Sequence, residues 1–204
     1  MSQRIGLFGG SFDPIHRGHV APVQDARRSL GLDRVIFLPT ARPPHKPDRR
    51  FASSWARYAM VELTLLDEEG LFVSPHELAG DRPAYTVETV EAFRQRLPDA
   101  ELSLVIGSDS FADLETWKRW RELVTLARLV VLVRPGWEPE RLRPDLPSPL
   151  RDLMDRQEID FVAVRPLPVS STELRRHFAR GSSPPADWIA EPVLRFIQKY
   201  DLYQ

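Results

Sequence analysis

The sequence predicts an α/β fold in which a doubly wound parallel sheet is covered by helices on both faces. Short apolar runs of strand length alternate along the chain with longer amphipathic segments. The candidate site residues follow the predicted strands, as they should where ligands bind beyond the carboxyl ends of parallel strands. A chain of 204 residues is long enough for one such domain. We therefore expect a single domain over 1–204, with a small helical part over roughly 171–204.

The first half of the chain predicts three strands that alternate with three helices. Apolar runs indicate the strands, and Pro39 closes the second of them. Gly31 is a helix stop, and Ser53 or Ser54 is a helix cap. The segment 40–50 is a loop because it contains three prolines. The predicted strands are 4–8, 34–38 and 71–74, and the predicted helices are 18–30, 53–65 and 86–97, the last with Thr86 as its N-cap.

The second half continues the alternation up to a helical end. Gly107 ends one strand, Ser170 and Glu173 fit a capping box at the start of a helix, and Gly181 stops that helix. Prolines and poor periodicity over 136–149 predict a surface connection with a short helix after it. The predicted strands are 102–106, 129–133 and 161–164, and the predicted helices are one or two over 111–126, one over 171–180 and one or two over 187–203.

The bulk composition excludes several classes of protein. A net charge of −1 gives no support for a general nucleic-acid or acidic-membrane binder. No apolar run approaches the ~20 residues that span a bilayer, and the N-terminus lacks the pattern of a signal peptide. The absence of cysteine excludes disulfides, thiolate metal sites and thiol catalysis, and it suits a cytoplasmic protein. The composition leaves the oligomeric state open, a homo-oligomer included.

The most informative stretch is 5–20, which reads I-G-L-F-G-G-S-F-D-P-I-H-R-G-H-V. Glycines after a strand let backbone N–H groups approach a phosphate, and a helix start adds positive partial charge at the same place. His16 and His19 can donate hydrogen bonds to phosphoryl oxygens there. The stretch contains neither of the two common glycine fingerprints of nucleotide-binding proteins. It nevertheless predicts a nucleotide phosphate site.

The motif G-G-S-F-D-P-I-H-R-G-H resembles the H-x-G-H signature of the nucleotidylyltransferase superfamily, and it is most similar to the bacterial nicotinate-nucleotide adenylyltransferases. The resemblance implies a Rossmann-like sheet and the transfer of AMP from ATP to nicotinate mononucleotide in NAD biosynthesis. Such transfers depend on positioning and on charge neutralisation at the phosphoryl oxygens. The matches extend from Gly6 to Arg175, so they cover nearly the whole chain.

The resemblance also implies roles for later residues. The segment S-S-T-E-L-R at 170–175 would hold the triphosphate, and P-P-H-K at 43–46 would lie near the phosphates. A-Y-T at 84–86 stands where the family usually has S-Y-T, and backbone N–H groups there would hold the nicotinate carboxylate. Trp117, ranked above Trp120 on its position in the motif alone, would stack on the pyridine ring.

The resulting site has three parts. The catalytic residues would be His16, His19 and Arg175. The ATP-binding residues would be Gly9, Gly10, Ser11, Phe12, Gly107, Asp109, Arg134, Ser171, Thr172 and Arg175. The substrate-binding residues would be His45, Lys46, Tyr85, Thr86 and Trp117. No dedicated protein metal cluster is expected, because Mg²⁺ would come with ATP and be held mainly by its phosphates.

Other functions remain open at this point. A related adenylyltransferase could use nicotinamide mononucleotide or phosphopantetheine, although phosphopantetheine enzymes usually carry T-x-G-H where His16 stands. A non-catalytic nucleotide-binding regulator could share the fold. A fragment of a class I aminoacyl-tRNA synthetase is disfavoured by the near-neutral charge and the lack of an anticodon-binding domain.

Overall fold

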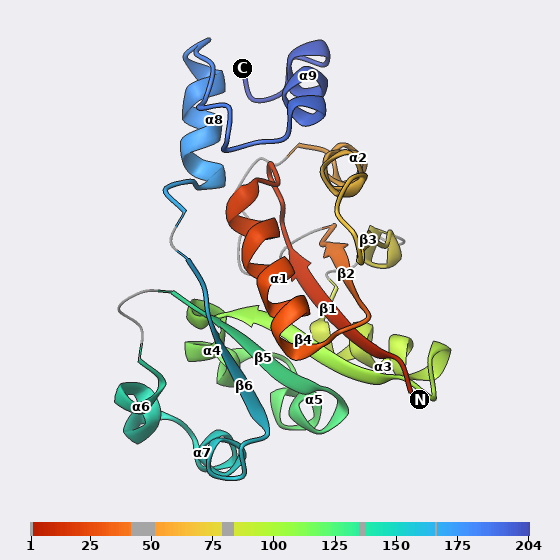
Figure 1. The fold of residues 1–204 in the computed structure, drawn as a ribbon, viewed down its shortest axis with the longest axis vertical. Coiled ribbons are helices and arrows are strands. Elements are labelled where there is room, and N and C mark those ends of the chain that lie inside the picture. Colours follow the sequence, from red (N-terminus) through yellow and green to blue (C-terminus); the bar gives the residue numbers. More distant parts are fainter. Residues whose placement is uncertain (1, 42–51, 79–83, 135–137, 166) are drawn as a thin grey trace. The chain divides into compact units, whose positions relative to one another are not determined.

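The fold was described from a computed structural model, which covers residues 2–41, 52–78, 84–134, 138–165 and 167–204. Six strands form one sheet, and helices follow the strands along the chain (Figure 1). The strands are β1 (Arg4–Gly10), β2 (Arg34–Pro39), β3 (Leu71–Val73), β4 (Glu101–Gly107), β5 (Arg128–Val133) and β6 (Ile159–Ala163). The α-helices are α1 (Arg17–Leu30), α2 (Ser54–Leu65), α3 (Thr86–Arg96), α4 (Ser108–Ala112), α5 (Trp120–Leu126), α6 (Pro139–Leu142), α7 (Ser148–Asp155), α8 (Ser171–Ala179) and α9 (Glu191–Lys199). The short 3-10 helices are η1 (His76–Leu78), η2 (Leu114–Thr116) and η3 (Arg143–Asp145).

The strand order is β3-β2-β1-β4-β5-β6. β4 pairs in parallel with β1 and with β5, and β5 pairs in parallel with β6. The first three strands therefore run from β1 toward one edge of the sheet. The chain then crosses back to the other side of β1, where β4, β5 and β6 follow in order toward the opposite edge. This is the order of a doubly wound Rossmann-like sheet, and the predicted fold class is confirmed.

Local sequence signals explain several boundaries. Ser53 caps α2 by accepting a hydrogen bond from the Ala56 N–H at 3.1 Å, as predicted. Gly31 follows α1 at φ +62° and Gly181 follows α8 at φ +63°, a conformation that glycine adopts without steric cost. The central strands bury nearly continuous apolar runs, as strands covered on both faces do.

Three predictions about helices are wrong. The region 111–126 holds the end of α4, then η2 and α5, because α4 begins directly after Gly107 and Arg119 adopts a left-handed φ of +52° before α5. The short helix predicted after the 136–149 connection is present as α7, but the connection itself also contains α6 and η3, which were not predicted. Thr86 is the first residue of α3 rather than its N-cap. Tyr85 is the N-cap, and its backbone carbonyl accepts hydrogen bonds from the Glu88 and Thr89 N–H groups.

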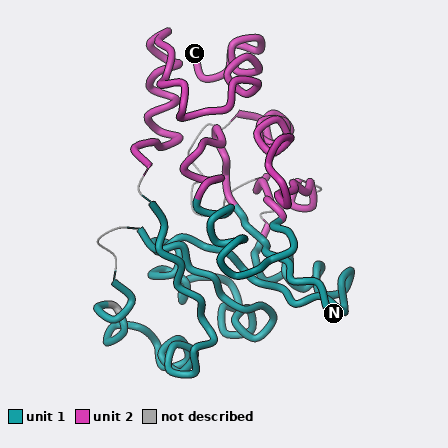
Figure 2. The backbone as a smooth tube through the Cα atoms, viewed as in Figure 1, with its two compact units in different colours: residues 1–9, 22–35, 85–166 teal, residues 10–21, 36–84, 167–204 magenta. Residues whose placement is uncertain are grey.

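The described residues cluster into two compact units, each made of separate stretches of the chain (Figure 2). Unit 1 comprises 1–9, 22–35 and 85–166, and unit 2 comprises 10–21, 36–84 and 167–204. Three of the five points at which the chain passes from one unit to the other lie within β1, α1 and β2. In the parts of the chain that the structure describes, none of the helices has the length and apolar character needed to cross a membrane.

Candidate active site

The strand order reverses between β1 and β4, where both strands end in glycine. Their parallel register pairs Leu7 with Leu104 and Phe8 with Val105, so their carboxyl ends reach the same edge of the sheet. A Cβ placed on Gly9 or on Gly107 would meet no atom within 4 Å. Ligands of doubly wound sheets bind at such a reversal, and the bare glycine backbone leaves room for close approach.

The two histidines of the H-x-G-H motif lie against each other in unit 2. Their ring centroids are 3.8 Å apart, and the His16 backbone N–H donates to Nδ1 of His19 at 3.3 Å. Because Nδ1 of His19 accepts this bond, the proton of the neutral ring resides on Nε2. His16 is 6% exposed, whereas His19 is half-buried. His19 therefore has an N–H group that can be donated to a phosphoryl oxygen.

Two glycines lie so close to these rings that a side chain at either position would force a neighbour to move. A Cβ at Gly18 would lie 3.0 Å from the His16 ring, and one at Gly10 would lie 2.7 Å from the ring of Phe12. Phe12 is buried, adopts φ +44°, and packs edge-on against His19 at a centroid distance of 5.3 Å. The Thr40 N–H donates to the Gly10 carbonyl at 3.0 Å. The glycines thus make space for the rings that orient His19.

The N-terminal turn of α8 is bonded to the same loop. Ser170 caps α8 by accepting from the Glu173 N–H at 3.2 Å, as the sequence predicts. Ser171 Oγ donates to the Pro14 carbonyl at 2.9 Å, and Arg175 Nη1 donates to the Asp13 carbonyl at 2.6 Å. Arg175 Nη2 also donates to Thr172 Oγ1 at 3.0 Å. Unit 2 therefore brings together the histidines, Ser11 and Phe12 with Ser171, Thr172 and Arg175.

Three residues of this loop environment were not singled out from the sequence: Asp13, Arg57 and Tyr203. Asp13 is fully buried and accepts a 2.7 Å hydrogen bond from the Tyr203 hydroxyl. Arg57 is 1% exposed and donates to three backbone carbonyls. Burial lowers the pKa of the Arg57 guanidinium, an effect that the negative charge of Asp13 opposes. Only Asp13 carried a sequence signal, because it lies inside the quoted motif.

In unit 1, Asp109 and Arg134 pair with each other after neighbouring strands. Arg134 Nη1 lies 3.1 Å from Asp109 Oδ2, and both side chains are more than two-thirds exposed. An ion pair this exposed contributes little to stability and opens at little cost. Both groups are therefore accessible for the ribose or phosphate contacts that the sequence predicts for them.

Three of the five residues predicted to bind the second substrate, Tyr85, Thr86 and Trp117, belong to unit 1. Lys118, which follows Trp117, lies 4.0 Å above the Tyr85 ring and 2.7 Å from Glu88 in α3. The start of α3 and the end of η2 are thus adjacent. Trp117 is half-buried, whereas Trp120 is 6% exposed and part of the core. Trp117 is the better of the two for stacking on a ligand, which agrees with its rank from the sequence.

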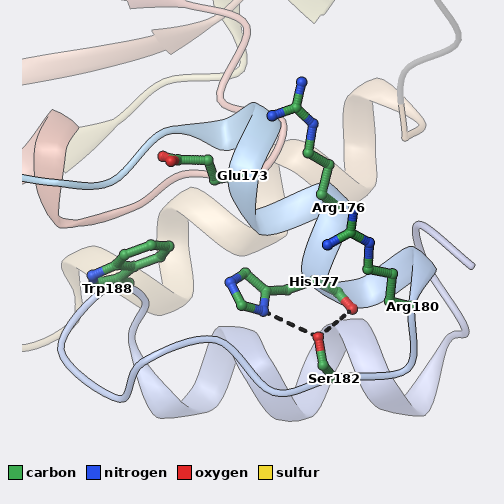
Figure 3. A pocket seen from close by; sticks show the side chains of 6 residues that line it. All are labelled: Glu173, Arg176, His177, Arg180, Ser182 and Trp188. Carbon is green, nitrogen blue, oxygen red and sulfur yellow. Dashed lines mark hydrogen bonds between the residues drawn. The ribbon is translucent and has the colours of Figure 1, made fainter.

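Not every predicted site residue is described by the structure, and one pocket lies apart from the predicted site. His45 and Lys46 lie outside the described residues. The described part of the chain holds no cluster of three or more His, Cys, Asp or Glu that could hold a metal ion. A pocket of about 300 Å³ lies on another face of α8, between Trp188 and the side chains of Arg176, His177 and Arg180 (Figure 3). None of the predicted site residues that the structure describes lines this pocket.

Comparison with known proteins bears on the whole chain. Residues 7–177 match the cytidylyltransferase-like family. A protein of Aeromonas salmonicida named "Probable nicotinate-nucleotide adenylyltransferase" is 39% identical over 214 residues, which cover 98% of this chain and 97% of the relative. A protein of the same name from Thermus thermophilus is 39% identical over 201 residues, covering 98% and 100%. The solved structure of Plasmodium falciparum nicotinic acid mononucleotide adenylyltransferase complexed with NaAD aligns with a TM-score of 0.77 at 19% identity, covering 98% and 97%, and shows the shared fold.

Proposed function

The chain belongs to the nicotinate-nucleotide adenylyltransferases of the cytidylyltransferase-like family, and on this premise we propose that it transfers the adenylyl group of ATP to nicotinate mononucleotide. A phosphate oxygen of the mononucleotide attacks the α-phosphorus of ATP. The bond from that phosphorus to the α,β-bridging oxygen breaks, and pyrophosphate leaves with nicotinate adenine dinucleotide as the other product. No general base is needed, because the attacking phosphate is already ionised.

The observation that carries the proposal is the bonding of α8 to the H-x-G-H loop. Arg175 and Ser171 both donate to carbonyls of that loop, at Asp13 and Pro14. Donors of the two motifs therefore occupy one region of unit 2. His19 would donate from Nε2 to a phosphoryl oxygen, while Arg175 and the N-terminal N–H groups of α8 would hold the leaving pyrophosphate. This arrangement supplies charge neutralisation where charge grows during transfer.

The acceptor would be held by the group around α3 in unit 1. The first N–H groups of α3 point away from the helix and suit a carboxylate, which the positive end of the helix dipole also favours. Trp117 would stack on the pyridine ring. Lys118, whose ammonium group lies over the Tyr85 ring and is paired with Glu88, would add positive charge near the nicotinate carboxylate. An uncharged nicotinamide would gain less from these groups.

We propose that Mg²⁺ enters with ATP. The donor chemistry fits this role, since Mg²⁺ takes oxygen ligands and Asp109, which is exposed and paired with Arg134, offers a carboxylate two residues after β4. Bound to the phosphates, the ion would neutralise charge on the triphosphate. We also propose a cytoplasmic location, which a sequence without cysteine suits.

The proposal is tested by identifying the products. Purified protein, ATP, Mg²⁺ and nicotinate mononucleotide should give equal amounts of pyrophosphate and nicotinate adenine dinucleotide. The products are separated and quantified by chromatography, and the dinucleotide is identified by mass spectrometry. ATP alone should give neither product. Release of pyrophosphate without the dinucleotide would contradict adenylyl transfer to this acceptor.

Replacing Trp117 with alanine should mainly raise KM for nicotinate mononucleotide, by about tenfold, because a stacked aromatic ring contributes on the order of 1 kcal/mol. Steady-state kinetics with each substrate varied in turn gives the two KM values. Trp55→Ala is the matched control, since Trp55 is 62% exposed on α2. A rise in the KM for ATP alone would show that Trp117 belongs to the other substrate's pocket.

A further inference from the structure

Asp13 forms a buried junction within unit 2. Its side chain is fully buried, and Oδ1 accepts hydrogen bonds from the Tyr203 hydroxyl at 2.7 Å and the Ala52 N–H at 3.1 Å. Arg175 Nη1 lies 3.9 Å from Oδ2 and donates to the backbone carbonyl of the same residue at 2.6 Å. A buried carboxylate is stable only when it is paired and hydrogen-bonded. Asp13 therefore serves the protein's own groups rather than a ligand.

Arg57 fixes the backbone on the other side of this junction. Its guanidinium donates to the carbonyls of Ser11 at 2.6 Å, Ala41 at 3.0 Å and Ala52 at 3.1 Å. Ser11 follows the glycine pair, while Ala52 also donates its N–H to Asp13. The planar fork of an arginine can satisfy several acceptors at fixed angles, which a lysine cannot. The loop that carries the glycines is thus held at both Ser11 and Asp13.

Tyr203 reaches this junction from 190 residues away in the sequence. Its ring stacks on Phe178 of α8 at a centroid distance of 6.1 Å, so it contacts the helix that bears Arg175. Its φ is +69°, a conformation that costs a non-glycine residue free energy and persists only where surrounding contacts hold it. Burial raises the pKa of its hydroxyl, and the charge of Asp13 raises it further, so the hydroxyl remains a donor.

We propose that Tyr203 is a positioning residue for adenylyl transfer, because its hydroxyl fixes Asp13, and Asp13 in turn fixes Arg175. Tyr203 does not touch the reacting atoms. Without its hydroxyl, the Asp13 carboxylate would lose the Tyr203 hydrogen bond at Oδ1 and would be drawn toward the positive charges of Arg175 and Arg57. The Arg175 guanidinium then departs from the geometry that transfer requires. This inference rests on the role proposed above for Arg175.

Tyr203→Phe removes one hydroxyl and keeps the ring on Phe178. We expect kcat to fall about tenfold, because small displacements of catalytic groups have effects of this size or larger. KM for nicotinate mononucleotide should not change, since the acceptor is not bound through Arg175. The matched control is Tyr200→Phe, three residues earlier, whose side chain is 56% exposed. Thermal unfolding of each variant sets an assay temperature at which all are folded.

A double-mutant cycle with Arg175→Ala separates positioning from general structural support. If Tyr203 acts through Arg175, the loss caused by Tyr203→Phe should disappear when Arg175 is already alanine. Losses that multiply in the double variant, or equal kcat values for Tyr203→Phe and Tyr200→Phe, would overturn the inference and leave the proposed function standing. Full activity of Arg175→Ala alone would overturn the proposed role of Arg175, and this inference with it.

Discussion

Replacing His19 with alanine should lower kcat about 100- to 1,000-fold, the range measured when one preorganised donor to a transition-state oxyanion is removed. The expected loss rests on the orientation of the His19 ring, since the His16 N–H donates to Nδ1 and the Nε2 N–H would donate to a phosphoryl oxygen. KM for ATP should change much less, because the interaction strengthens as charge develops in the transition state. Pyrophosphate release at saturating substrates measures the effect.

Two further variants test whether this loss is specific to the N–H donor of His19. His19→Gln retains an N–H donor and should recover part of the lost rate. His177→Ala removes a histidine of α8 that is bonded to Ser182 and should leave the rate unchanged. If His19→Ala turned over at the normal rate, the histidine would have no part in the transfer.

Replacing Arg175 with alanine should lower kcat/KM for ATP by about 100-fold, because both the bound triphosphate and the leaving pyrophosphate lose a charged donor. Part of the loss should appear in KM, in contrast to His19, since the triphosphate carries its charge before the reaction begins. Arg175→Lys keeps the charge but loses the fork that joins Asp13 and Thr172, so it should recover only part of the activity.

Arg176→Ala is the matched control for Arg175. Arg176 is the next residue of α8, is exposed, and lines the separate pocket between α8 and Trp188. Its removal changes the net charge by the same amount. Equal losses for the two alanine variants would show that the helix acts through its overall charge rather than through the Arg175 position.

The sequence predicted those parts of the fold and site that have local signals. Apolar runs marked all six strands, most clearly β1, β4 and β5, because strands buried on both faces have no polar alternation to obscure them. Ser170 was recognised as a cap because its partner, Glu173, is three residues away. The H-x-G-H loop was recognised because its glycines and histidines follow one another closely in the sequence. The sequence pattern was sufficient to predict a residue's role where its neighbours in space are also its neighbours in sequence.

Long-range contacts could not be predicted in this way. Arg57 lies within α2 and resembles a charge on a solvated helix face, yet the structure buries it against carbonyls as far as 46 residues away. Tyr203 meets Asp13 across 190 residues. Tyr85 rather than Thr86 is the N-cap of α3, and no side chain caps this helix, so residue type alone gave the wrong cap position. Only the folded chain shows these relations.

Adenylylation of nicotinate mononucleotide is tested most directly by pyrophosphate release, measured side by side with nicotinate mononucleotide, nicotinamide mononucleotide and phosphopantetheine at equal concentrations. We expect the highest kcat/KM for nicotinate mononucleotide, a clearly lower value for the amide, and none above background for phosphopantetheine. Equal values for the first two would contradict selection of the acid, and a preference for phosphopantetheine would contradict the function itself.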